Sequence, residues 1–200
     1  MKTDIVLAGV GGQGILSIAN VLGISALEDN LYLKQAEVHG MSQRGGDVQS
    51  NLRISDSPIH SDLIPYHTAD LIVSLEPMEC LRYLPYLSAT GWIVTNTTPF
   101  VNIDNYPDLK AIMHELQQTE NLIAFDMDDM AKKIGSPRSS NMVLLGAASP
   151  FINLSEASII DGIRKQFEKK GEKLVEVNIE AFKAGREETI NFLKSRNKTV

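Results

Sequence analysis

Glycines at a fixed spacing near the start of the chain are the first pattern able to do chemistry. Residues 9–14 read GVGGQG, follow a short apolar run and precede a helical pattern. Glycine permits positive φ and close approach of the backbone, and the free N–H groups at the start of a helix attract an anion. The pattern therefore predicts a site for a phosphate or carboxylate, with these candidate binding residues: Gly9, Gly11, Gly12, Gln13 and Gly14.

The same spacing, G-x-G-x-x-G, is typical of proteins that bind nicotinamide or flavin dinucleotides. Such proteins place an acidic residue about 20 residues further on, at the end of the second strand. Here Lys34 and Gln35 stand at that distance, and Glu37 comes slightly late. Three interpretations stay open: a dinucleotide site, a site for another anionic group or a partner, and a purely structural turn.

A second glycine-punctuated loop lies within residues 37–46, which read EVHGMSQRGG. It follows the carboxyl end of a predicted strand, where open α/β sheets bind their ligands. The guanidinium of Arg44 suits a carboxylate or phosphate, and Gln43 offers an amide. We add Ser42, Gln43, Arg44, Gly45 and Gly46 to the candidate binding residues. The alternative is a tight turn in which Arg44 pairs with an internal acid.

Other chemistries find less support in the residues. The lone Cys80 cannot form an internal disulfide or supply the thiolates of an iron–sulfur cluster, so it is predicted to be a buried, inert thiol. His60, His67 and His114 lack a second ligand at the spacing of a known metal motif, and no metal site is expected. No G-x-S-x-G elbow occurs, which disfavours serine hydrolase chemistry. No side chain is singled out as catalytic.

Hydrophobic periodicity predicts the elements that must position these loops. Strands are predicted at 5–8, 32–38, 48–54, 69–75, 91–96 and 122–125. Helices are predicted at 14–27, at 77–87 with a break at Pro85, at 127–134, at 141–148 and at 155–170. After the stop signal Gly171, residues 175–177 are predicted to be extended, before a last helix from about Ile179. The alternation predicts a single three-layer α/β/α domain over residues 1–200, Rossmann-like, with a mostly parallel sheet.

Composition limits the class of protein. The chain has 200 residues, of which 43% are hydrophobic and 22% charged, as expected for one globular domain. Its 19 basic and 25 acidic residues give a net charge of −6, so neither nucleic acid nor an anionic membrane is an expected partner. Apolar runs fall far short of the roughly 20 residues of a membrane span, and the start reads as a strand. We expect a cytoplasmic protein.

Four motifs in order resemble a known family. They are the GVGGQG start, the EVHGMSQRGG loop, the N-x-x-LLGA segment at residues 141–147 and the NIEAFKAG segment at residues 178–185. Together they are similar to the gamma-type module of 2-oxoacid:ferredoxin oxidoreductases, the pyruvate/ketoisovalerate oxidoreductase gamma-type domain. The second loop is most similar to the indolepyruvate branch of the family, in which this module is a separate beta subunit.

The resemblance implies a subunit that is inactive alone. The complex would decarboxylate an arylpyruvate oxidatively to an aryl-acetyl-CoA and pass two electrons to ferredoxin. Thiamine diphosphate enzymes of this kind carry a GDG motif, which is absent here. Thiamine diphosphate, Mg²⁺ and the 4Fe–4S clusters are therefore expected on a larger alpha subunit, with coenzyme A as co-substrate and no cofactor on this chain alone.

The same resemblance also implies partners for this chain. The expected partners are the larger subunit and, through the complex, ferredoxin; a homodimer of the isolated chain is an alternative arrangement. A detached subunit should also keep an apolar patch near the two glycine loops. Two other functions stay open: an independent dinucleotide-binding oxidoreductase, in which Glu37 would reach a ribose hydroxyl, and a scaffold module without chemistry.

Overall fold

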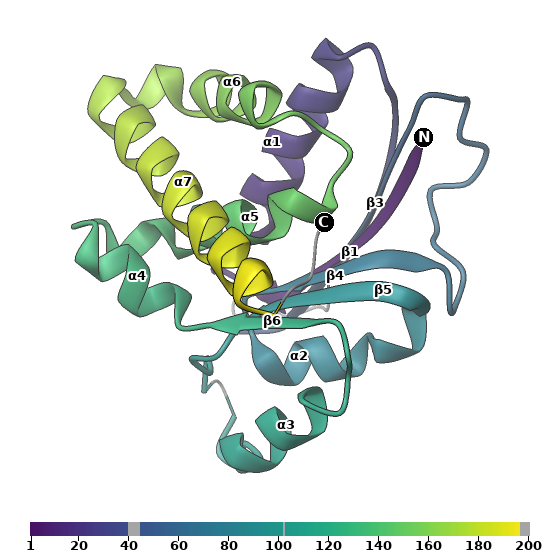
Figure 1. The fold of residues 1–200 in the computed structure, drawn as a ribbon, viewed down its shortest axis with the longest axis vertical. Helices are drawn as coiled ribbons and strands as arrows, with labels where there is room; N and C mark the ends of the chain where they lie inside the picture. The colour runs from purple at the N-terminus through teal and green to yellow at the C-terminus, as the bar shows by residue number, and fades with distance from the viewer. Residues whose placement is uncertain (40–44, 102, 197–200) are drawn as a thin grey trace.

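The structure, a computed structural model, describes residues 1–39, 45–101 and 103–196. Within these residues six strands form one sheet in the order β2-β3-β1-β4-β5-β6 (Figure 1). The strands are β1 (Lys2–Val10), β2 (Tyr32–His39), β3 (Asp47–Ser55), β4 (Ala69–Ser74), β5 (Leu87–Asn96) and β6 (Leu122–Phe125). All six lie where the hydrophobic pattern predicts them.

The sheet is mostly parallel, as predicted. β1, β4, β5 and β6 pair in parallel, whereas β3 is antiparallel to both β1 and β2. A parallel connection needs a crossover of a dozen or more residues, and residues 40–46 are too few for one. β2 and β3 therefore form a hairpin, which places β3 between β2 and β1.

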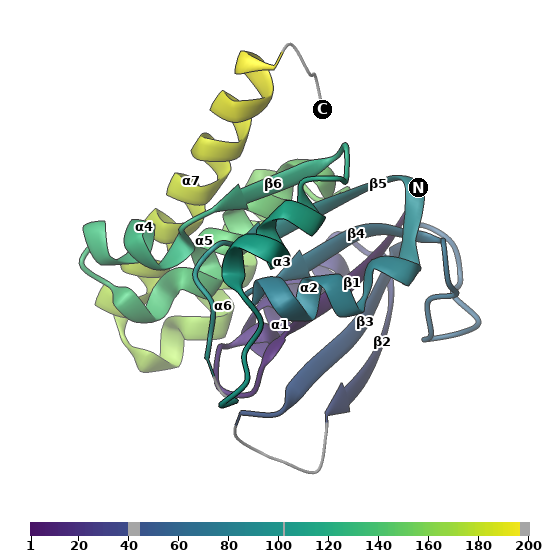
Figure 2. The same ribbon diagram turned by 90° about the horizontal axis from the view of Figure 1, so that it is seen from below.

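Helices cover both faces of this sheet (Figures 1 and 2). One face carries α1 (Ile15–Glu28), α4 (Met127–Lys133), α5 (Ser140–Ala148), α6 (Glu156–Phe167) and α7 (Glu172–Ser195). The other face carries α2 (Pro77–Arg82) and α3 (Leu109–Leu116). Short 3₁₀ turns lie at Leu84–Tyr86, Pro137–Ser139, Ser149–Phe151 and Glu168–Lys170.

Successive side chains of β1 point alternately into the hydrophobic cores on the two faces of the sheet. Ile5 and Leu7 point into the core beneath α1 and α5–α7, whereas Val6 and Ala8 point into the core beneath α2 and α3. Successive side chains of a strand point to opposite faces, so a continuous apolar run is what a strand buried on both sides requires. The predicted three-layer α/β/α architecture is confirmed.

Two predicted details are wrong or missing. Residues 175–177 are not extended, because α7 runs unbroken from Glu172 to Ser195. Val175, Ile179 and Phe182 are buried at helical spacing, and this packing outweighs the β preference of the two valines. Helix α3 was not predicted; its start is marked by Asp108, whose side chain accepts a hydrogen bond from the Lys110 N–H.

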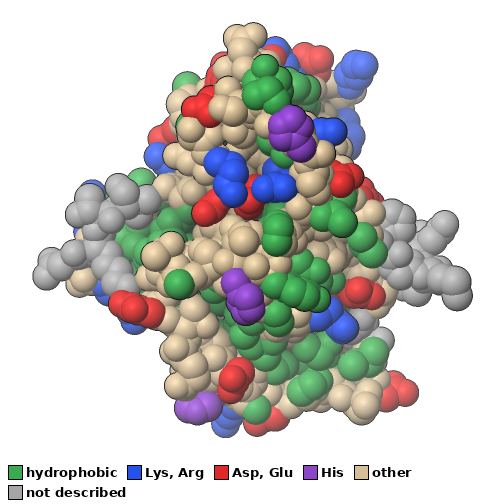
Figure 3. Space-filling view, turned by 90° about the vertical axis from the view of Figure 1, so that its right-hand side faces the viewer, with side chains coloured by type: hydrophobic (Ala, Val, Ile, Leu, Met, Phe, Trp, Pro, Cys, Tyr) green, Lys and Arg blue, Asp and Glu red, His purple; other side chains and the backbone are tan. Residues whose placement is uncertain are grey.

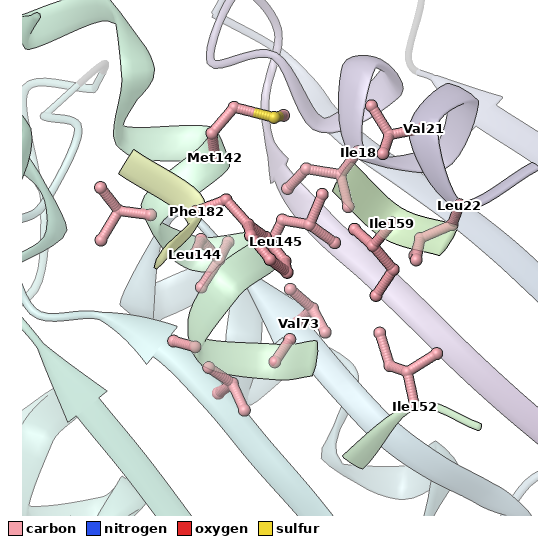
Figure 4. Packing of buried hydrophobic residues seen from close by; sticks show 14 of the residues in the cluster. Ile18, Val21, Leu22, Val73, Met142, Leu144, Leu145, Ile152, Ile159 and Phe182 are labelled. Carbon is pink, nitrogen blue, oxygen red and sulfur yellow. The ribbon is translucent and has the colours of Figure 1, made fainter. Parts of the chain in front are cut away.

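α5 and α7 approach each other closely through two glycines. A Cβ on Gly146 would lie 1.8 Å from the Phe182 carbonyl oxygen, and one on Gly185 would lie 1.9 Å from that of Val143. Figure 4 shows Phe182 of α7 beside Leu144 and Leu145 of α5. The N-x-x-LLGA and NIEAFKAG motifs therefore pack against each other.

Among the residues that the structure describes, no helix combines the length and the apolar character that crossing a lipid bilayer would require.

Candidate functional site

The two glycine loops meet at the carboxyl end of β1. The Gly11 N–H donates a hydrogen bond to the Gly46 carbonyl oxygen at 2.8 Å. Val10, the last residue of β1, pairs with Asp47, the first residue of β3. The structure thus brings Gly45 and Gly46 to the 9–14 loop, while Ser42, Gln43 and Arg44 lie outside the described residues.

Gly12 and Gly14 of the first loop are glycines for different physical reasons. Gly12 and Gly14 adopt φ values of 104° and 88°, a left-handed region that disfavours side chains. A Cβ on Gly14 would lie 2.6 Å from Nδ2 of Asn141, whereas one on Gly12 would meet no atom within 4 Å. The backbone at Gly12 is therefore open to a ligand, and the backbone at Gly14 is packed.

Gln13 uses its side chain on the protein's own backbone. Its Oε1 accepts a hydrogen bond from the Val10 N–H at 2.7 Å, and its Nε2 donates one to the Leu75 carbonyl oxygen at 3.2 Å. Leu75 directly follows β4, so Gln13 joins the end of β1 to the end of β4. We assign Gln13 a positioning role in the loop.

The start of α1 is a candidate site for an anion. Gly14 is the N-cap residue and has no side chain to cap the helix. The first N–H groups of a helix have no intrahelical partner and carry the positive end of its dipole. The chemistry that this geometry supports is binding of a phosphate or carboxylate at the first turn, beside the open backbone of Gly12.

Asn141, at the start of the LLGA motif, holds this loop from the far end of the chain. Its Nδ2 donates a hydrogen bond to the Gly14 carbonyl oxygen at 3.2 Å, across 127 residues of sequence. Asn141 is buried, and it lies in the first turn of α5. It was not among the predicted site residues; the motif could have pointed to it, but its partner could not be predicted.

A buried carboxylate lies at the end of β4, next to the glycine loop. Glu76 is fully buried, accepts a hydrogen bond from the Glu79 N–H at 2.8 Å, and accepts another from the Tyr106 hydroxyl. Burial raises the pKa of Glu79, although Arg82, 2.8 Å away, opposes that shift. Burial, and then the hydrogen bond to Glu76, raise the pKa of Tyr106. Sequence reasoning missed this group, whose only signal is Glu76 placed as an N-cap before Pro77.

The strand order does not match a dinucleotide site. In that class the second strand lies directly beside the first, so that its terminal acid reaches the ribose. Here β3 separates β2 from β1, a distance of two strand spacings or about 10 Å. Glu37 is exposed on β2 and pairs in register with Ser50 of β3.

The described residues do not fit a metal or an iron–sulfur cluster. Among them no group of three or more His, Cys, Asp or Glu side chains could hold a metal ion. Cys80 is fully buried, as predicted, and burial raises its pKa to about 12. A cluster needs several thiolates, which Cys80 cannot supply. His60, His67 and His114 are exposed.

Fold and site together define an open α/β domain whose β1–α1 glycine loop is hydrogen-bonded to the β2–β3 hairpin. The family described as pyruvate ferredoxin/flavodoxin oxidoreductase matches residues 4–188. The chain belongs to this family, and the predicted resemblance is confirmed.

Curated relatives cover nearly the whole chain. It is similar to "Indolepyruvate oxidoreductase subunit IorB" of Methanothermobacter thermautotrophicus, at 35% identity over 92% of this chain and 96% of the relative. The protein of the same name from Pyrococcus horikoshii is 38% identical over 91% of this chain and 93% of its own length.

A solved structure shares the fold. The 2-oxoglutarate:ferredoxin oxidoreductase from Magnetococcus marinus, with 2-oxoglutarate, coenzyme A and succinyl-CoA bound, has a TM-score of 0.75 and 24% identity. The match covers 95% of this chain and 31% of that chain. The chain thus spans under a third of that longer polypeptide.

Proposed function

We propose that this chain is the small subunit of an indolepyruvate:ferredoxin oxidoreductase. In the proposed reaction the bond between the carboxyl and keto carbons of indolepyruvate breaks and CO₂ leaves. The remaining acyl group forms a thioester with coenzyme A, and two electrons pass to ferredoxin. The observation that carries the proposal is the 35–38% identity to two indolepyruvate oxidoreductase subunits over more than nine-tenths of the chain.

We propose further that the redox cofactors lie on a larger subunit. Thiamine diphosphate with Mg²⁺ supplies the decarboxylation chemistry when bound, and 4Fe–4S clusters carry the electrons. The buried Cys80 supports this assignment, because no other cysteine exists in the chain to hold a cluster. Residues 1–200 would then form one gamma-type domain of the complex, with ferredoxin as its acceptor.

The glycine loops are the proposed contribution of this chain to the active complex. The first turn of α1 and the open backbone at Gly12 would bind an anionic group, either a phosphate of coenzyme A or the carboxylate of the 2-oxoacid. Gly9, Gly11 and Gly14 set the shape of that loop, and Gly46 joins it to the second loop. Arg44 would supply the positive charge.

A substrate comparison on the reconstituted complex tests the reaction. Chain and larger subunit are mixed with coenzyme A and an electron acceptor, and acceptor reduction is followed with indolepyruvate, 2-oxoglutarate or pyruvate. The proposal expects the highest kcat/KM for indolepyruvate. A preference for 2-oxoglutarate or pyruvate would move this chain to another branch of the family.

The role of Arg44 has its own test. Replacing Arg44 with alanine should leave the fold intact, because substitutions in loops usually cost little stability. Loss of a charge-assisted contact should lower kcat/KM by about 10- to 150-fold. Arg44→Lys should rescue only in part, because an ammonium lacks the planar fork. An Arg44→Ala complex that assembles and keeps full kcat/KM for both substrates would leave this loop structural.

A further inference from the structure

Large apolar side chains are exposed at the edge of the sheet that carries the glycine loops. Ten of the described residues are exposed large hydrophobics, and five of them lie at the carboxyl ends of the parallel strands or of β2. These five are Leu16, Val38, Phe100, Val101 and Ile103, which are 40%, 54%, 44%, 65% and 41% exposed. Three of them share the 97–108 segment between β5 and α3, of which the structure describes residues 97–101 and 103–108.

The 97–108 segment is fixed at both of its ends. At the first end the Thr98 hydroxyl donates to Asp126 at 2.9 Å, and the Thr98 N–H donates to the side chain of Asn96 at 3.3 Å. At the second end the Tyr106 hydroxyl donates to the buried carboxylate of Glu76. Hydrogen bonds at both ends therefore hold the segment in place while its apolar side chains remain exposed to solvent.

The second anchor also ties this segment to the glycine loop. Gln13 donates to the Leu75 carbonyl oxygen, and Glu76, the next residue, receives the Tyr106 hydroxyl. Figure 2 shows the segment between β5 and α3 reaching the edge of the sheet where β1 gives way to α1. A partner seated on this segment would lie next to the proposed anion site.

Acidic side chains border the apolar residues. Asp104, Asp108 and Asp126 are all exposed on or beside the segment. An apolar centre with a charged rim is the usual anatomy of a protein–protein interface, and the sign of the rim selects the partner. The matching surface should therefore be apolar with lysine or arginine at its border.

We propose that Phe100, Val101 and Ile103 form the docking surface for the larger, cofactor-carrying subunit, a role that rests on the proposed function. The solved relative whose chain is about three times as long supports this occupant, because most of that polypeptide lies outside the shared module. Docking here would cover exposed apolar area and bring the cofactors of the partner to the glycine loops. A second copy of this chain is the competing occupant, and the test below separates the two.

The opposite edge of the sheet offers a matched control. Figure 3 views the side that carries the amino ends of the parallel strands, and hydrophobic side chains gather there too. Leu63, in the connection between β3 and β4, is 57% exposed. Its backbone is held by Arg53, which donates to the Leu63 carbonyl oxygen at 3.0 Å. Leu63→Asp therefore places the same charge on a comparably exposed aliphatic position, 57% against 65% for Val101, away from the proposed surface.

The experiment measures the affinity of the purified chain for the purified larger subunit by titration calorimetry. Val101→Asp should weaken binding at least about tenfold, as buried interface anchors do, and Leu63→Asp should leave it within about twofold of the parent chain. Tyr106→Phe should weaken binding by a smaller factor, because it frees one anchor and keeps the apolar side chains. Circular dichroism confirms that each variant folds.

The outcomes distinguish this surface from the proposed function. If the parent chain does not bind the larger subunit, the proposed function fails. If the parent chain binds and Val101→Asp binds equally well, the docking surface is wrong while the function stands; a loss confined to Leu63→Asp would mean that the opposite edge docks. If Val101→Asp abolishes only self-association, measured by light scattering, a second copy occupies the surface and the proposal is overturned.

Discussion

At the scale of single residues, the polar side chains around the glycine loop make hydrogen bonds to the backbone. These bonds explain why amide side chains stand at these positions. The Gln13 side chain must accept from the Val10 N–H and donate to the Leu75 carbonyl oxygen, and an amide does both through two separate atoms. Asn141 needs only a donor, directed at the Gly14 carbonyl oxygen. These side chains fix the loop shape. The N–H groups of Val10, Gly11 and Gln13 are bonded within the protein, so a ligand would have to meet other N–H groups of this turn.

The change Gln13→Glu tests this assignment. The carboxylate keeps an acceptor and loses the donor, so the Leu75 carbonyl is left without that bond and faces a negative charge. We expect the free energy of unfolding to fall by about 1–3 kcal/mol. Gln117→Glu, on the exposed end of α3, should stay within about 0.5 kcal/mol of the parent chain. Urea unfolding compares the three proteins, and equal stability of Gln13→Glu and Gln117→Glu would refute the positioning role.

At the scale of elements, the sequence allows most of the sheet and little of its pairing to be predicted. Strands such as residues 5–8 stand out because burial on both faces needs a continuous apolar run. The break predicted at residues 175–177 failed because local β preference was read without the packing of Val175 against the core. The short α3 lacks enough turns to show a period. The order of β3 between β1 and β2 follows from a hairpin that the strand pattern alone does not reveal.

The contact between α5 and α7 predicts a sharp response to one methyl group. In Gly146→Ala the new Cβ would lie 1.8 Å from the Phe182 carbonyl oxygen, so the helices must move apart. We expect a loss of about 1–3 kcal/mol or more. The control Gly23→Ala in α1 meets only the flexible Leu33 side chain at 3.2 Å and gains helix propensity, so its stability should change by less than about 1 kcal/mol. Thermal unfolding of both variants tests this prediction. Equal melting temperatures of Gly146→Ala and Gly23→Ala would contradict the close approach of α5 and α7.

The start of α4 predicts a pH-dependent contribution. Asp126 accepts a hydrogen bond from the Asp129 N–H at 2.8 Å, and this bond holds the pKa of Asp126 below its ordinary value. A lowered pKa means that the stabilisation is present above about pH 4 and is lost as the pH falls through the folded-state pKa. Asp126→Ala should cost about 1 kcal/mol at neutral pH and less near pH 3. Urea unfolding midpoints of the variant and the parent chain at both pH values check this. A stability difference between the two proteins that grows on acidification would contradict it.

At the scale of the whole molecule, the candidate site is only partly readable from sequence. The loop at residues 9–14 was predicted because all of its parts are neighbours in the chain. Tyr106 and Asn141 were missed because the groups they support, Glu76 and Gly14, lie far away in sequence. The exposed apolar surface at the same edge agrees in place with the expectation for a detached subunit. The partner proposed to cover it is a separate polypeptide, which no pattern in this chain can describe.

An omission assay tests the central claim, that this chain works only as part of a cofactor-carrying complex. Reduction of ferredoxin by indolepyruvate and coenzyme A is measured with the chain alone, the larger subunit alone and the two together, alongside iron and thiamine analysis of each preparation. The account predicts activity only in the mixture, with iron and thiamine only in the larger subunit. Full activity of the larger subunit alone, or a stoichiometric iron–sulfur cluster in the isolated chain, would contradict it.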